Sequence, residues 1–545
     1  IIIRDIWRYL NLCSITILFV LSTYATMFTK PAELILPITV IFILSAFITG
    51  IIRVLLLYTT TRFSYATGAD LAIDVYRRTL NQDYSKHLAQ NSSEIINSIT
   101  IKTHTIIAGM LNPSLIFISS LVLIVITSST LFFIDPYVTF ISFFFFGLLY
   151  SLVMVFTHKQ LRENSEIMAK ESSKIIKVVQ EGLGGIRDVI IDGNQEFYTK
   201  IYRKSDIPLR RALGNTQFIN SSPRYIMESI GMILIAGIAY FMSLQEDELS
   251  TVIPVLGALA LGAQRILPAL QQLYGAYTGI KSAKFSFIDV LSLLEQPLPR
   301  NNSLSNISPI IFKKNIHINN ISFKYSGTKK EVLKNISLNI PKGSIIGFIG
   351  TTGSGKSTLL DIIMGLLTHS SGTIKIDKIK IDNSNQQQWR KNIAHVPQSV
   401  FLSDASIKEN IAFGVPINEI SQDNLENAAK QSQLDELINE LPEKYETHVG
   451  ERGIRLSGGQ RQRIGIARAI YKQAQVLIFD EATSALDNKT EKEVMKSIYG
   501  LNKDLTILIV AHRISTLSNC DYIYSIKNGL VNLEGGYKDV IERTS

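Results

Sequence analysis

Residues 344–367, SIIGFIGTTGSGKSTLLDIIMGLL, decide the fold of the C-terminal half of the chain. An apolar run that predicts a strand is followed by a glycine-rich segment and then by a helical run, which is the context that a P-loop requires. The glycines let successive backbone N–H groups turn toward phosphate oxygens, and the helix N-terminus adds positive potential. The segment therefore predicts a nucleotide site, lined by Gly350, Thr351, Thr352, Gly353, Ser354, Gly355, Lys356, Ser357 and Thr358.

Four side chains near this segment have distinct expected roles. Lys356 would reach the β- and γ-phosphates, and Ser357 would coordinate Mg²⁺. A second apolar run, AQVLIFD, ends in Asp480 and is followed by Glu481. Because ligands bind at the carboxyl ends of strands in such sheets, Asp480 is expected to hold the Mg²⁺ shell and Glu481 to polarise the attacking water. The alternative, an ordinary acidic strand end, is disfavoured by the P-loop.

The composition indicates a membrane part joined to a soluble part. Of 545 residues, 46% are hydrophobic and 19% charged, which is apolar for a soluble protein but too charged for one lying wholly in lipid. The net charge of +9 fits the basic cytoplasmic side of a membrane protein, and no nucleic-acid partner is expected because no basic motif with interleaved aromatics occurs. Cys13 and Cys520 are too few for a disulfide framework or zinc site and are expected to be inert core thiols.

Six apolar stretches predict a bundle of six membrane spans, since a bilayer core of about 30 Å needs about 20 helical residues. They are 9–29, 34–52, 105–134, 136–157, 229–245 and 249–264. Basic residues gather between Arg62 and Lys86 and between Lys159 and Arg211, which marks those connections as cytoplasmic. We expect a multi-pass protein of a bacterial inner membrane, with its C-terminal half in the cytoplasm.

Residues 62–104 and 158–223 are too long for simple loops and have helical patterning. They are interpreted as membrane helices that extend into the cytoplasm, with small separate subdomains as the alternative. The turns near 82–92 and 204–210 are expected to reach the C-terminal half. The Pro-, Asn- and Ser-rich stretch 297–309 predicts a linker between a transmembrane domain, 1–296, and an α/β domain with a largely parallel sheet, 310–545.

The segment LSGGQ at 456–460, with its extension RQRIGIARA, resembles the signature of ATP-binding-cassette (ABC) proteins. The resemblance implies that Tyr325 stacks on adenine, Gln398 links Mg²⁺ to the membrane domain, Asp487 forms the D-loop, His512 contacts the γ-phosphate, and VGERG at 449–453 is the X-loop of exporters. Blander interpretations are a strand-edge aromatic for Tyr325, a buried structural histidine for His512 and a helix-start loop for SGG. None of them accounts for the ordered set.

The resemblance also implies a dimer, in which Ser457, Gly458, Gly459 and Gln460 cap the ATP held by the partner's P-loop. A second helix N-terminus would then complete the charge stabilisation around the triphosphate. Since Glu481, His512 and the signature are all intact, a homodimer with two composite sites is expected. Making and losing the ATP clamp would drive alternating access in the membrane domain.

Arginines within or beside the spans bear on the substrate. Arg53, Arg224 and Arg265 would be costly in lipid, so we expect them to face a cavity that suits an anionic head group. Snorkelling to the interface, or an Arg224–Glu228 pair, is the alternative. The segments SSPRYIMESIG, GAQRILPALQQL and GIIRVLLLY resemble PglK-type flippases, which implies a lipid-linked oligosaccharide.

Other functions stay open at this point. A peptide, drug or general lipid exporter is the alternative within transport. An ATP-gated channel or a regulatory ABC protein is the alternative of another class, and the intact Glu481 argues against a purely regulatory ATPase.

Overall fold

A computed structural model describes residues 31–134, 136–243, 249–297, 308–328, 330–483, 485–500, 504–511 and 513–544. The chain forms two compact units, one made of Ile1–Asn81 and Asn91–Pro297 and the other of Gln82–Gln90 and Leu298–Ser545. The predicted first span, 9–29, and residues 298–307 of the predicted linker lie outside the described residues.

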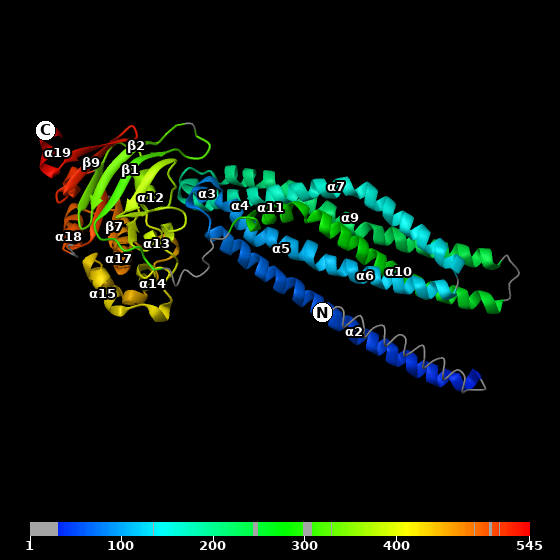
Figure 1. Cartoon of the computed structure of the whole chain (residues 1–545). Helices are drawn as coiled ribbons and strands as arrows, with labels where there is room; N and C mark the ends of the chain where they lie inside the picture. Colours follow the sequence, from blue (N-terminus) through cyan, green and yellow to red (C-terminus); the bar gives the residue numbers. More distant parts are fainter. Residues whose placement is uncertain are drawn as a thin grey trace. The chain divides into compact units, whose positions relative to one another are not determined.

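The first unit is helical throughout its described part (Figure 1). Its helices are α2 (Pro31–Leu80), α4 (Ser92–Asn97), α5 (Thr103–Ile106), α6 (Asn112–Ile134), α7 (Pro136–Gly184), α8 (Ile186–Ile191), α9 (Gln195–Ser243), α10 (Leu249–Ser282) and α11 (Lys284–Leu294), with π-helical turns η1 (Ser98–Lys102) and η2 (Ile107–Leu111). Helix α2 has 50 residues, which at 1.5 Å per residue is about 75 Å and far exceeds a bilayer core. The prediction that membrane helices extend beyond the bilayer is confirmed.

Three helical segments of the described part are long and apolar enough to cross a membrane: Ile35–Leu80, Ser92–Thr130 and Phe143–Gly184. They overlap the predicted spans 34–52, 105–134 and 136–157. The predicted spans 229–245 and 249–264 fall within α9 and α10, which are continuous helices over the described residues of those ranges.

Close backbone packing joins η2 to α10. A Cβ added at Gly279 would lie 3.0 Å from the carbonyl oxygen of Gly109, and a Cβ at Gly109 would lie 3.0 Å from the Cβ of Ala283. Small residues let helix backbones approach in this way where lipid supplies no hydrophobic driving force. Farther along the bundle, α7, α9 and α10 bury a cluster of large side chains: Phe146, Tyr150, Leu161, Ile219, Met227 and Tyr274.

The structure confirms one of the two predicted cytoplasmic turns and contradicts the other. The first is confirmed, because Gln82–Gln90, which contains α3 (Tyr84–Ala89), belongs to the same compact unit as the C-terminal half. The second is wrong, because 204–210 lies inside α9, where Pro208 does not end the helix. The chain turns instead after α8 at Gly193, whose φ is +67°, and Asn194 N–H bonds Val189 O at 2.9 Å to close the turn.

The second unit contains two sheets (Figure 1). Strands β2 (Leu333–Pro341), β1 (Asn315–Phe323), β4 (Ser371–Ile376) and β5 (Ile379–Lys380) form an antiparallel sheet in that order. The larger sheet has the order β10 (Leu530–Gly535), β9 (Tyr522–Lys527), β3 (Ile345–Ile349), β8 (Thr506–Val510), β7 (Val476–Asp480) and β6 (Ile393–Val396). Only the β10–β9 pair in it is antiparallel, so the predicted largely parallel sheet is confirmed.

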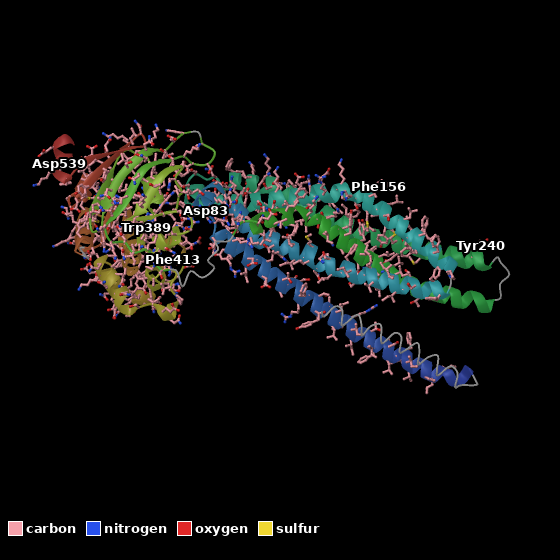
Figure 2. All side chains as sticks on the ribbon, viewed as in Figure 1. Asp83, Phe156, Tyr240, Trp389, Phe413 and Asp539 are labelled. Carbon is pink, nitrogen blue, oxygen red and sulfur yellow. The ribbon has the colours of Figure 1, made fainter. Side chains whose placement is uncertain are left out.

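The helices of the second unit complete an α/β fold around these sheets. They are α12 (Lys356–Ile363), α13 (Gln386–Arg390), α14 (Ile407–Ile411), α15 (Gln422–Gln431), α16 (Asp435–Glu440), α17 (Gly458–Tyr471), α18 (Asn488–Tyr499) and α19 (Tyr537–Thr544), with a 3₁₀ turn η7 (Ile514–Leu517). Trp389, labelled in Figure 2, is fully buried; its indole donates to Ile363 O at 2.8 Å and its ring meets the edge of Phe312. This contact fixes α13 against α12.

Candidate functional site

The carboxyl ends of four neighbouring parallel strands bring the predicted site residues together. Strand β3 ends at Ile349, directly before the P-loop, and β7 ends in Asp480, which pairs with Val510 at the end of β8. Strand β6 ends at Val396, two residues before Gln398. The sheet therefore delivers loops from distant parts of the sequence to one edge, as expected for ligand sites of α/β folds.

The P-loop forms a cradle around its own lysine. The ammonium of Lys356 donates to Gly350 O at 2.8 Å and to Thr351 O at 3.2 Å, and the residue is buried. Gly355, which precedes α12, has φ +108°, and a Cβ there would lie 2.8 Å from Leu333 Cδ2, so glycine is required at this close approach.

One polar atom of the cradle is left for a ligand. The hydroxyl of Ser354 is buried and has no hydrogen-bond partner among the described residues. Buried hydroxyls are rarely left unpaired, because desolvation without a compensating bond is costly. A phosphate oxygen is a partner that such a donor fits.

Glu481 and Gln398 meet directly. The amide Nε2 of Gln398 donates to Glu481 Oε2 at 2.7 Å, and Glu481 N–H bonds Val510 O at 3.1 Å. Glu481 adopts a φ of +53°, an uncommon conformation for a residue with a side chain. Loop geometry thus turns this carboxylate toward Gln398 at the sheet edge.

Two titratable groups that sequence reasoning missed lie near Asp480. Burial, with a further contribution from Asp480, raises the pKa of Asp361 to about 6. Burial lowers the pKa of His395 on β6, a shift that nearby Asp480 partly opposes, and its Nε2 has no partner among the described residues. Asp361 lies three residues after Thr358 of the P-loop and His395 lies three residues before Gln398, but only the fold brings them to Asp480.

Tyr325 lies against the P-loop helix. Its hydroxyl is 3.0 Å from Thr358 Oγ1, and its ring meets the edge of Phe323 at 5.0 Å between centroids. Tyr84 of α3 lies close by: burial, then Asp361 and Tyr325, raise the pKa of the Tyr84 phenol. Within the second unit, the segment 82–90 therefore lies near the nucleotide loop.

The signature segment is a helix start with both capping bonds formed. Ser457 Oγ accepts from Gln460 N at 3.2 Å, and Gln460 Oε1 accepts from Ser457 N at 2.7 Å, which begins α17 at Gly458. Ser457 is exposed, so the N-terminus of α17 is open to a ligand or a partner. The helix-start interpretation of SGG is therefore true of the local structure, and it leaves the anion-binding end accessible.

Asp487 caps the next helix. Its carboxylate accepts from Lys489 N and Thr490 N, each at 3.0 Å, and from Thr490 Oγ1 at 2.6 Å, which begins α18. These bonds lower the pKa of Asp487. Its local role is thus an N-cap, a role the sequence motif did not reveal, while His512 lies outside the described residues.

The side chains at the sheet edge suit a Mg²⁺ ion that is bound together with a nucleotide. Among the described residues, no three His, Cys, Asp or Glu side chains gather into a metal cluster. Hard oxygen ligands suit Mg²⁺, and Asp480, the exposed Ser357 and the amide oxygen of Gln398 would supply them while phosphates and water complete an octahedron. These residues would therefore hold the ion together with the nucleotide.

The arginines of the first unit occupy different environments. Arg224 Nε donates to Glu228 Oε1 at 2.9 Å, four residues later on α9, so the predicted alternative of an internal pair does form. Its side chain is 61% exposed. Arg53 is exposed on α2, and Arg265 lies on α10 with its side chain outside the described part. Among the described side chains, no hydrogen bond or ion pair joins Arg53 to Arg224.

Two family models match the chain. The model described as "ABC transporter transmembrane region" covers residues 11–250, and the model described as "ABC transporter" covers residues 333–484. The first match lies mostly in the helical unit, and the second lies within the unit that carries the P-loop.

Relatives match most of the chain. A Staphylococcus aureus protein named "putative multidrug export ATP-binding/permease protein" is 30% identical over 465 residues, covering 84% of this chain and 78% of that protein. The "ATP-dependent lipid A-core flippase" of Pseudoalteromonas translucida is 30% identical over 475 residues, 86% of this chain and 80% of its own length. A solved structure of a bacterial Atm1-family ABC exporter with ATP bound shares the fold with a TM-score of 0.81 at 22% identity, covering 98% of this chain and 93% of that one.

Proposed function

This chain belongs to the ABC transporter family of membrane exporters, in which ATP hydrolysis drives export, and we propose that it works as a homodimer that flips an anionic, lipid-linked substrate. Each copy carries one P-loop and one signature segment. Two copies would enclose two ATP molecules, each between the P-loop of one and the open N-terminus of α17 of the other. Because one sequence carries both an intact P-loop and an intact signature segment, a homodimer is favoured over a heterodimer.

The residues at the sheet edge have defined roles in this proposal. The backbone of the P-loop and Lys356 bind the phosphates, and Glu481 accepts a proton from the attacking water while Gln398 orients its carboxylate. Mg²⁺, when bound, neutralises charge on the transferred phosphoryl group. In the sequence, His512 lies two residues after the end of β8, and we assign it to the γ-phosphate.

The hydrogen bonding of Arg224 is the observation that supports an anionic substrate. Glu228 holds the guanidinium through Nε alone, which leaves both terminal nitrogens without a hydrogen bond among the described residues. Two parallel N–H donors match phosphate or pyrophosphate oxygens bidentately. Arg53 and Arg265, on other helices of the bundle, add positive charge along a route for such a head group.

The relatives bear on the choice of substrate. One relative is named for flipping lipid A-core and another for multidrug export, so a lipid and a drug are the two classes to separate. Resemblance to PglK-type flippases in the segments around the three arginines favours a lipid-linked oligosaccharide. A pyrophosphate-linked glycolipid would use the terminal nitrogens of Arg224, whereas a neutral drug would not.

Flipping in vesicles tests this proposal. The purified transporter is reconstituted with a fluorescently labelled, pyrophosphate-linked oligosaccharide lipid, and outward movement is measured by quenching after ATP is added. The expected result is ATP-dependent flipping that Glu481→Gln abolishes and that Arg224→Ala reduces by about tenfold, the loss expected for a charge-assisted bidentate contact.

The chain offers a matched control on the same helix. Arg210 pairs with Asp206 at 3.1 Å, also at a spacing of four residues on α9 but outside the predicted spans. Arg210→Ala should flip the lipid at the wild-type rate. Efflux of cationic drugs by the wild type, without any flipping of the lipid, would overturn the substrate class and leave the ATPase assignment intact.

A further inference from the structure

A buried carboxylate outside the predicted site connects two of its loops. Glu491, on the first turns of α18, is 8% exposed. Its Oε1 accepts from Thr483 Oγ1 at 2.9 Å and from Thr516 Oγ1 at 2.8 Å, and its Oε2 lies 3.3 Å from Arg513 Nη1. Three donors from two separate loops thus converge on one side chain.

Each of these donors follows closely on a residue assigned to hydrolysis. Thr483 lies two residues after Glu481, and Arg513 comes directly after His512. Thr516 lies in η7, the turn that continues from that segment, and is itself buried. The loops after β7 and after β8 therefore share a single anchor.

The buried carboxylate of Glu491 depends on its three hydrogen-bond donors. A carboxylate is held in a buried position only when charge-assisted hydrogen bonds offset its desolvation, and here three donors do so. Removing it would leave the buried hydroxyl of Thr516 and the half-buried hydroxyl of Thr483 without their acceptor. The two loops could then shift relative to each other although each strand stays paired.

The anchor continues to the signature helix. Asp487 caps α18 four residues before Glu491, and Ala485 N in the same loop donates to Gln462 Oε1 of α17 at 3.0 Å. Asn488 holds Arg513 from the first turn of α18, with Oδ1 accepting from Nη1 at 2.7 Å. The first turns of α18 thus join the loops after β7 and β8 to the helix that begins at the signature.

We propose that Glu491 is a positioning residue for ATP hydrolysis, which fixes the loops of Glu481 and His512 in register with each other and with α17. The inference rests on the proposed roles of Glu481 and His512. Glu491 is buried and its carboxylate is occupied by these donors, so its loss is expected to lower the rate of the chemical step and to leave ATP binding by the P-loop in place.

Steady-state ATPase kinetics of the full-length transporter in lipid test this inference. Glu491→Ala is expected to lower kcat by about 10²-fold, as a small misplacement of catalytic groups does, with the KM for ATP within about twofold of wild type. Glu491→Gln keeps an Oε1 that accepts from both threonines and is expected to restore most of kcat. Glu493→Ala, which removes an exposed carboxylate from the same helix, should behave as wild type.

A second variant covers the case in which Glu491→Ala does not fold. Thr516→Val removes one hydroxyl with little change of volume and should lower kcat by about tenfold with KM unchanged. Wild-type kcat in both Thr516→Val and Glu491→Ala, or a fall in ATP affinity that parallels the fall in kcat without recovery in Glu491→Gln, would overturn the inference. If instead Glu481→Gln hydrolyses ATP normally, the proposed catalytic role of Glu481 fails, and this outcome is distinct from any result at Glu491.

Discussion

The side-chain amide of Gln398 donates a 2.7 Å hydrogen bond to the carboxylate of Glu481. The two residues are 83 positions apart and meet because β6 and β7 are parallel neighbours that end at one edge. An amide that donates to the carboxylate fixes its orientation, and the amide oxygen stays available to a metal. The bond therefore links the loop expected to sense Mg²⁺ to the group expected to activate water.

A double-mutant cycle tests whether this bond acts in hydrolysis. Glu481→Gln should lower kcat by about 10²–10⁴-fold, the range for loss of a general base, and Gln398→Ala by about tenfold, because the carboxylate loses its orientation. The double variant should be no slower than Glu481→Gln alone, since the amide then has no carboxylate to orient. The matched control is Gln422→Ala, which breaks a 2.7 Å Gln–Glu bond on the exposed face of α15. Additive losses in the double variant would contradict the link.

Asp361→Asn should change stability in a pH-dependent way. Burial and Asp480 raise the pKa of Asp361 to about 6 from 3.8. The folded state therefore holds this proton more tightly than the unfolded state, and stability falls as pH rises from about 4 to 6. Without nucleotide and Mg²⁺, the amide should raise stability at pH 7 by on the order of 1 kcal/mol and leave it nearly unchanged at pH 4. Melting temperatures at the two pH values, with the exposed Asp423→Asn as control, measure this difference; a lower melting temperature for Asp361→Asn at pH 7 would refute it.

Cys520 should resist thiol reagents in the folded protein. The residue is 7% exposed, and burial, followed by the charge of Asp521, raises the pKa of its thiol to about 12. Only the thiolate reacts, and at pH 8 a thiol with this pKa is about 10⁻⁴ ionised. In a Cys13→Ser background, labelling by a disulfide reagent should become at least about a hundredfold faster once the protein is unfolded. Ser518→Cys, at an exposed position nearby, should label at once; equally rapid labelling of native Cys520 would show that the thiol is reachable.

The sequence predicts those parts of the site that are local in the chain. The P-loop and the Asp480–Glu481 strand end are each specified by an apolar strand followed by a characteristic loop, and the parallel sheet brings their ends together as expected. The capping box at Ser457 is likewise specified by four consecutive residues, Ser457–Gln460. Such features could be found without the fold.

Features that depend on packing between distant segments could not be found in this way. No sequence pattern assigned a role to Glu491, Asp361 or His395, because their environments arise only when separate loops and strands converge. The sequence also does not show that β1 pairs antiparallel in a second, smaller sheet, because alternation of side chains does not specify the partner strand. The turn expected at 204–210 is absent because α9 continues through these residues, Pro208 included.

Mixing two inactive variants tests the composite sites. Lys356→Ala disables the P-loop of a copy, and Ser457→Arg blocks the N-terminus of its α17 with a charge that repels the positive end of the helix. Each variant alone should be inactive as a homodimer. In a mixed dimer, however, the one intact P-loop faces the one intact signature, so a 1:1 mixture should recover up to about a quarter of the wild-type ATPase rate.

Placing both changes on one chain and mixing it with wild type is the control. Every site of that mixed dimer is broken, so the mixture should hydrolyse ATP only at the rate of its wild-type homodimers. If the two single variants fail to complement each other while the control mixed dimer is active, ATP is bound and hydrolysed within a single copy and the homodimeric clamp is wrong.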